Sequence, residues 1–194
     1  MANVAKYDRD EVIHKAMMLF WEKGFNATST RDLQDAVNLR PGSFYAAFGS
    51  KEALFSEALK LYASESHDYL LNMSAENDSA MGVIRAFMQG IILGRKKVAP
   101  SEMCMLVKTI AELTDEHSVL LEQSRELLKN TERQLAQLLE KAQQEGEFSK
   151  HKSCSHTASY LMVQIMGLRT YMRNSQSPKL IESLLDEMFS NLQH

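Results

Sequence analysis

The chain has 194 residues, of which 44% are hydrophobic and 24% are charged, and its formal net charge is -3. No apolar run approaches the length of a membrane span, and the N-terminal sequence MANVAKYDRDEV contains no apolar signal segment. The two cysteines, Cys104 and Cys154, are too few for a disulfide framework. We therefore expect a globular, cytoplasmic protein.

The charge distribution gives no sign of a broad nucleic-acid-binding surface. Residues 1–60 hold eight Lys or Arg and eight Asp or Glu, so the first third of the chain is neutral. Any binding of DNA by this part of the chain must then depend on a few well-placed cations and on backbone amides.

Helical periodicity extends over nearly the whole sequence, and no strand-like alternation persists. The expected fold class is all-α. Helices are predicted at about 8–23, 30–38, 41–48 and 51–72, followed by a polar linker at 74–79. Further helices are predicted at about 80–96, 101–113, 117–145, 155–174 and 178–192.

Short-range signals mark the ends of the first helices. Gly24 is a stop signal for the first helix, and Ser29 with Asp32 forms a capping box for the second. Asn38 tolerates the left-handed conformation that ends the second helix, and Pro41 is favoured at the first position of the third. Two short helices joined by a tight turn are typical of a helix-turn-helix, which presents one helix to the major groove of DNA.

The stretch from Thr30 to Leu54, TRDLQDAVNLRPGSFYAAFGSKEAL, resembles the TetR family of bacterial transcriptional regulators. Nine residues occupy matching or equivalent positions: Thr30, Leu33, Ala36, Leu39, Gly42, Tyr45, Phe48, Lys51 and Leu54. Three positions depart from the family pattern. Asn38 replaces a glycine, Arg40 replaces a serine cap, and Ala47 replaces a histidine that would contact phosphate. A purely structural helical hairpin is the alternative interpretation of this stretch.

The resemblance implies a three-helix DNA-binding domain over residues 6–66. Phosphate contacts are expected from the residues Thr30, Gly42, Tyr45 and Lys51, and base contacts from Arg31, Arg40, Pro41 and Ser43. It also implies a helical ligand-binding and dimerisation domain over residues 67–194. The expected partners are a palindromic operator, an unidentified small effector and a second copy of the chain, with no cofactor, no metal and no enzymatic activity.

The last two predicted helices, 155–174 and 178–192, are apolar over much of their surface, which favours a dimer interface over an intramolecular core. The candidates for lining an effector pocket are Phe87, Met88, Met103 and Met105, although each is equally consistent with ordinary core packing.

Cys104 precedes Lys108 by four residues. On one face of a helix, the ammonium would lower the thiol pKa and favour a redox or electrophile sensor. A small buried hydrophobe is the alternative role of Cys104. The segment His151, Cys154 and His156 matches no standard zinc spacing and is expected to be a solvated loop.

The predicted function is that of a homodimeric, DNA-binding transcriptional repressor released from its operator by a small effector. The alternatives are an activator, a thiol-sensing repressor acting through Cys104, or a helical carrier or enzyme with an incidental hairpin. Six scattered histidines and no recognisable catalytic arrangement argue against the enzyme.

Overall fold

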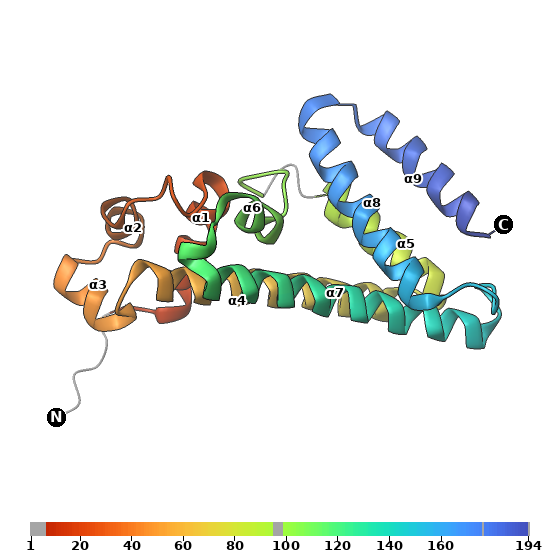
Figure 1. Cartoon of the computed structure of the whole chain (residues 1–194), viewed down its shortest axis with the longest axis horizontal. Helices are drawn as coiled ribbons and strands as arrows, with labels where there is room; N and C mark the ends of the chain where they lie inside the picture. The colour runs from red at the N-terminus through yellow and green to blue at the C-terminus, as the bar shows by residue number, and fades with distance from the viewer. Residues whose placement is uncertain (1–6, 95–98, 176, 194) are drawn as a thin grey trace. The chain divides into compact units, whose positions relative to one another are not determined.

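A computed structural model describes residues 7–94, 99–175 and 177–193 of the chain. Within these ranges all regular structure is helical, which confirms the all-α prediction (Figure 1). The α-helices are α1 (Arg9–Lys23), α2 (Thr30–Val37), α3 (Pro41–Phe48), α4 (Lys51–Glu76), α5 (Ala80–Leu93), α6 (Met105–Glu112), α7 (Ser118–Glu145), α8 (Cys154–Ser175) and α9 (Pro178–Gln193). A short 3₁₀ helix, η2 (Asp115–His117), precedes α7.

The helices form two compact units. The N-terminal unit comprises the chain up to Ser64 together with Met105–Arg125, and the C-terminal unit comprises Glu65–Cys104 and the chain from Glu126 onward. Helix α6 therefore belongs to the N-terminal unit, although the sequence analysis assigned it to the C-terminal domain. The functional boundary between residues 66 and 67 stays a prediction, and its outer limit at residue 6 lies outside the described residues.

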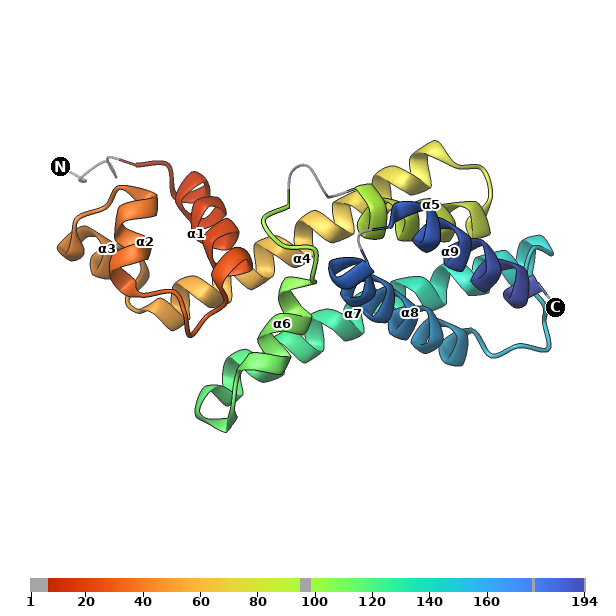
Figure 2. The same ribbon diagram turned by 90° about the horizontal axis from the view of Figure 1, so that it is seen from above.

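In the N-terminal unit, α1, α2 and α3 gather beside the first turns of α4 (Figure 2). The core between them is strongly aromatic: Phe20 meets Phe55 edge-to-face at 4.7 Å, and Phe25 lies 4.9 Å from the same ring. The start of α1 is held to α4 by Arg9, which pairs with both carboxylate oxygens of Glu57 at 2.5 and 2.7 Å. These contacts fix the frame on which the short helices α2 and α3 are mounted.

In the C-terminal unit, α5 packs against both α8 and α9. The core contains residues from α4, α5, α7, α8 and α9, including Leu70, Ile84, Phe87, Met88, Leu135, Leu139, Leu161, Ile181 and Leu185. Tyr69 lies directly over Gly90 of α5, and its ring centroid is 6.0 Å from that of Phe87. Gly90 is thus a point of close approach, where a larger residue would collide with the tyrosine ring.

Two predicted boundaries are wrong, and a third lies outside the described residues. Helix α4 continues to Glu76 through half of the expected linker, and the Ser74 hydroxyl returns a hydrogen bond to the Leu70 carbonyl at 3.1 Å. Helix α6 begins at Met105 and not at 101. The predicted end of the fifth helix at 96 cannot be compared, because residues 95–98 are not described. No helix in the described part of the chain is long and apolar enough to cross a membrane.

Candidate nucleic-acid interface

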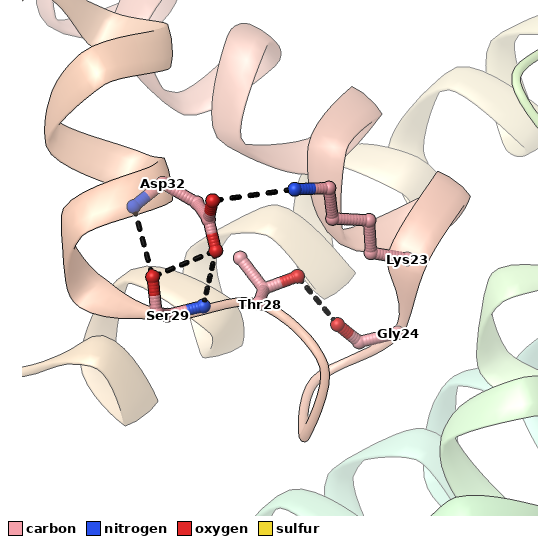
Figure 3. Close-up of polar contacts among 5 residues, drawn as sticks. All are labelled: Lys23, Gly24, Thr28, Ser29 and Asp32. Carbon is pink, nitrogen blue, oxygen red and sulfur yellow. Dashed lines mark hydrogen bonds and ion pairs between the residues drawn. The ribbon is translucent and has the colours of Figure 1, made fainter.

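The entry of α2 is fixed by the predicted capping box. The Ser29 hydroxyl accepts a hydrogen bond from the Asp32 N–H at 3.0 Å, and Asp32 Oδ2 accepts from the Ser29 N–H at 2.8 Å and from its hydroxyl at 2.7 Å (Figure 3). Lys23 Nζ lies 3.3 Å from the other carboxylate oxygen. The hydrogen bonds from Ser29, aided by Lys23, lower the pKa of Asp32 to about 2. Thr30 and Arg31 follow this cap directly.

The turn between α2 and α3 consists of residues 38–40. Asn38 adopts the expected left-handed conformation, with φ 54° and ψ 43°. The Leu39 N–H donates to the Gln34 carbonyl at 3.0 Å and closes the end of α2. Helix α3 then starts at Pro41, and its N-cap residue Arg40 forms no side-chain capping bond. The Arg40 side chain is therefore not used to cap the helix that it precedes.

The two sides of α3 differ in burial. Phe44 and Phe48 point into the core, where they are 0% and 5% exposed, whereas Tyr45 is 51% exposed. The predicted contact residues Arg31, Arg40, Pro41, Gly42 and Ser43 are all exposed, and Thr30 is half-buried. Within the described residues, neither Arg31 nor Arg40 forms an ion pair. The outward side of α3 and its preceding turn thus carry five of the predicted contact residues, namely Arg40, Pro41, Gly42, Ser43 and Tyr45.

Gly42 is not required by the protein's own packing. A Cβ built on Gly42 meets nothing within 4 Å, and its φ lies outside the range that favours glycine. It sits in the first turn of α3, where backbone N–H groups have no intrahelical partner. A missing side chain at this place leaves those N–H groups accessible to a phosphate.

Lys51 lies differently from the expectation. Its Nζ is 4.1 Å from the centroid of the Phe25 ring, and burial lowers the pKa of the Lys51 ammonium. The negative fields of Glu52 and Glu112 partly oppose this effect. The phosphate contact assigned to Lys51 stays a prediction, and it requires the ammonium to leave the ring.

The proposed activation of Cys104 by Lys108 lacks its geometric premise. Cys104 lies before the first residue of α6 and in the other compact unit, so the two residues do not share a helix face. Lys108 Nζ instead donates to the carbonyls of Trp21 and Glu22, at 2.7 and 3.0 Å. Burial raises the pKa of the second thiol, Cys154, which disfavours its reactive form. A sensor role for Cys104 remains an untested prediction.

The four predicted pocket residues do not lie in one unit. Phe87, Met88 and Met103 belong to the C-terminal unit, whereas Met105 belongs to the N-terminal unit and is 1% exposed. Met103 Sδ lies 3.4 Å from a guanidinium nitrogen of Arg173. Their role in effector binding stays a prediction.

A hollow of about 380 Å³ lies elsewhere in the C-terminal unit, between the start of α8 and the end of α9. Its lining includes Lys152, His156, Tyr160 and Asn191, and none of the four predicted pocket residues. In the described part of the chain, no three His, Cys, Asp or Glu side chains lie close enough together to hold a metal ion.

Two family profiles match the chain. Residues 12–58 match "Bacterial regulatory proteins, tetR family", and residues 70–188 match "Tetracyclin repressor-like, C-terminal domain". The second match alone covers more than half of the chain. The chain belongs to the TetR family of bacterial transcriptional regulators. The helix-turn-helix α2–α3 is accordingly the DNA-binding element of a TetR-family regulator.

Named relatives agree with this assignment. The HTH-type transcriptional repressor ComR of Escherichia coli (strain K12) is 28% identical over 175 residues, which cover 88% of this chain and 82% of ComR. The repressor BdcR of the same organism is 42% identical over 57 residues, covering 29% of each chain.

Solved structures show the same TetR fold. A cysteine mutant of the TetR-family regulator CifR, complexed with 26-base-pair operator DNA, superimposes with a TM-score of 0.85 at 22% identity, over 93% of this chain and 94% of CifR. The reduced form of E. coli NemR superimposes with a TM-score of 0.83 at 21% identity, over 95% of this chain and 96% of NemR.

One feature beside the DNA-binding element could not be predicted from the sequence. Helix α6 contacts the last turn of α1 through Lys108 and the turn after α1 through Glu112, across more than eighty residues of sequence. No local pattern signals such a contact, because it joins residues that are distant in the sequence.

Proposed function

We propose that this TetR-family protein is a homodimeric repressor that binds a palindromic operator and is released from it by a small effector. The observation that carries the proposal is the exposed side of α3 and its turn, which holds five predicted contact residues while Phe44 and Phe48 fill the core behind them. ComR, which matches most of the chain, is itself a transcriptional repressor by name.

Phosphate binding falls to Thr30, Gly42, Tyr45 and Lys51. The exposed Tyr45 ring meets Phe44 edge-to-face at 5.5 Å, which orients its hydroxyl without burying it. Lys51 exchanges the Phe25 ring for a phosphate when DNA binds. A cation–π contact near the surface contributes about 0.5–1 kcal/mol, which a charge-assisted bond to phosphate can replace.

Base reading falls to Arg31, Arg40, Pro41 and Ser43. Arginine matches the acceptor pair of guanine in the major groove, and the proline ring suits a thymine methyl. Arg40 is exposed and forms no ion pair within the described residues, so its guanidinium is available to the DNA. Because residues 1–60 have no net charge, the affinity for DNA also depends on a few well-placed groups.

A second copy of the chain binds at α8 and α9. Helix α8 exposes Tyr160, Val163 and Tyr171 to the extent of 37%, 63% and 44%, and Leu180 of α9 is 41% exposed. A Cβ on Gly167 would meet nothing within 4 Å, so this part of α8 admits close approach of another helix. A two-fold protein is what a palindromic operator requires.

The experiment is a binding measurement with duplexes from the region upstream of the gene. Arg31→Ala is expected to relax preference at one operator position by about 1–3 kcal/mol. Tyr45→Phe is expected to weaken binding similarly on all sequences, because phosphate contacts carry no sequence information. Unchanged affinity and preference in Arg31→Ala would show that the reading residues are wrongly assigned.

A further inference from the structure

Two side chains of α6, with opposite charges, form hydrogen bonds with the end of α1 and the turn that follows it. Lys108 and Glu112 are four residues apart and therefore lie on the same side of α6. Lys108 Nζ donates to the carbonyls of Trp21 and Glu22 at 2.7 and 3.0 Å. These carbonyls belong to the last turn of α1, where backbone acceptors lack intrahelical partners and the helix dipole is negative.

The second side chain, Glu112, contacts backbone N–H groups and not carbonyls. The carboxylate of Glu112 accepts hydrogen bonds from the N–H groups of Phe25 and Asn26, at 3.0 and 2.6 Å. Successive N–H groups in such a turn form a concavity that favours an anion. A cation thus meets carbonyls and an anion meets N–H groups, and we call these four hydrogen bonds the α6 clamp.

The turn is shaped to receive the carboxylate. Gly24 has φ 91°, and an added Cβ would lie 2.6 Å from Glu112 Oε2. On the other side of the turn, the Thr28 hydroxyl donates to the Gly24 carbonyl at 2.6 Å (Figure 3). The turn is therefore held from within by Thr28 and from outside by Glu112.

The same segment also meets the side chain of Phe25. The His117 ring, which follows α6 in η2, lies edge-to-face with the Phe25 ring at 4.8 Å. Lys51 occupies another side of that ring, at 4.1 Å. Residues 105–117 thus contact both the backbone and the ring of Phe25. Phe25 lies four residues before Ser29, the N-cap of α2.

We propose that Lys108 and Glu112 are positioning residues for DNA recognition. The α6 clamp fixes the turn from Gly24 to Thr28, and that turn sets the entry of α2, which carries Thr30 and Arg31. Without the clamp the turn samples more conformations, and the affinity for DNA falls with the fraction of molecules that hold the competent one. This inference rests on the proposed assignment of the DNA-contacting residues.

The chain before α6 is anchored in the C-terminal unit. Arg169, which is 5% exposed, donates through Nε to the Glu102 carbonyl at 2.8 Å. The backbone runs from this anchor directly into α6 and the clamp. Only residues 103 and 104 separate Glu102 from the first residue of α6.

The first test is hydrogen exchange in the full-length protein. Glu112→Gln keeps the size of the side chain but has one acceptor oxygen, and its NH₂ opposes one of the two N–H donors. Lys108→Met keeps the aliphatic stem and removes the donors. We expect faster deuterium uptake in peptides covering residues 21–29 for both variants. Glu116→Gln and Lys60→Met, at exposed positions of η2 and α4, serve as matched controls.

The second test is operator affinity as a function of salt. Both clamp variants are expected to weaken binding roughly tenfold. The dependence of log K on log salt keeps its slope, because neither side chain contacts a phosphate. Thermal melts and helical circular dichroism of each variant exclude global unfolding as the cause.

The outcomes distinguish a failure of the proposed function from a failure of the proposed role of the α6 clamp. Failure of the proposed function appears in the wild-type protein as an absence of sequence-dependent binding at every salt concentration. The inference is overturned if exchange in residues 21–29 is unchanged, or if exchange rises while affinity stays at the wild-type value. A reduced salt slope in either clamp variant also overturns it, because the residue would then contact DNA directly.

Discussion

The carboxylate of Glu112 occupies the space that a side chain on Gly24 would need. A Cβ at that position would lie 2.6 Å from Oε2 and 3.0 Å from Oε1 of Glu112. Gly24 also combines φ 91° with ψ 170°, a region open almost only to glycine. Gly24 therefore ends α1 and, because it has no side chain, leaves room for the carboxylate of Glu112.

Gly24→Ala is expected to destabilise the protein by about 2 kcal/mol or more, from backbone strain and from displacement of the carboxylate. Urea unfolding of Gly24→Ala, Glu112→Ala and the double mutant separates the two causes. The double mutant should lose less stability than the sum of the single losses, because the collision is absent once Glu112 is removed. Strict additivity would show that the carboxylate does not lie against Gly24.

The capping box of α2 predicts a stability change at low pH. The folded-state pKa of Asp32 is about 2, below its ordinary value of 3.8, so the carboxylate stabilises the fold above pH 3.8. That contribution is lost as pH falls from 3.8 toward 2. Asp32→Asn should lower the urea midpoint near neutral pH, and the difference from the wild type should shrink over this window.

Ser29→Ala is the companion variant, because the largest part of the pKa shift comes from the Ser29 hydroxyl. It should raise the pKa of Asp32 toward its ordinary value, as measured by carboxyl NMR titration. High salt should change the wild-type result little, because the hydrogen bonds outweigh the screened contact with Lys23. An unchanged Asp32 titration in Ser29→Ala would contradict this account.

The close approach of Tyr69 to α5 predicts opposite effects at two glycines of that helix. A Cβ on Gly90 would lie 1.7 Å from the Tyr69 oxygen and 2.5 Å from Cζ, whereas the nearest atom to a Cβ on Gly82 is at 3.4 Å. Gly90→Ala should displace the ring and cost about 1–3 kcal/mol. Gly82→Ala should be neutral or stabilising by up to about 1 kcal/mol. Thermal melts and near-UV circular dichroism check both, and equal effects would contradict the packing.

The features that the sequence predicted correctly are local. Ser29 with Asp32, Asn38 and Pro41 each act on backbone groups within a few residues, so spacing and residue type were sufficient to place them. The exposure of Tyr45 beside the buried Phe44 and Phe48 was not predicted, because Tyr45 is three residues from Phe48 and periodicity alone places both on one helix face.

The features that the sequence could not supply depend on distant partners. The Lys51 ammonium lies over Phe25, and Lys108 donates to the end of α1, because the fold brings together residues that are distant in the sequence. The expected Cys104–Lys108 pair assumed a helix that begins at 101, whereas α6 begins at Met105, one residue after Cys104. Spacing of four residues has meaning only when both positions are helical.

The exposed side of α8 gives a test of assembly. Val163→Glu should place a charge in the proposed interface and shift the protein toward monomer in analytical ultracentrifugation, with weaker operator binding. Val163 is 63% exposed, so the change should not disturb the core of its own unit. Met166 of the same helix packs against that core and is therefore less suitable. Val119→Glu is the matched control, because Val119 is 80% exposed in α7 and lies in the N-terminal unit. A wild-type monomer at micromolar concentration would contradict the two-fold assembly.

The backbone at Gly42 gives the most direct test of how α3 meets DNA. Gly42→Ala adds a methyl group where nothing lies within 4 Å, so the free protein should be as stable as the wild type or slightly more stable. If a phosphate approaches the first turn of α3, the same methyl group lies in its path. Binding should then weaken at least about tenfold, and to a similar extent on every sequence, because a phosphate contact carries no base information.

Gly82→Ala, in the other compact unit, controls for any general effect of a glycine-to-alanine change in a helix. Anisotropy titrations with the operator and with a scrambled duplex measure both variants. A Gly42→Ala protein that binds as tightly as the wild type would place the phosphate away from the start of α3. A loss confined to the operator duplex would instead assign Gly42 to base reading, since only contacts to base edges distinguish one sequence from another.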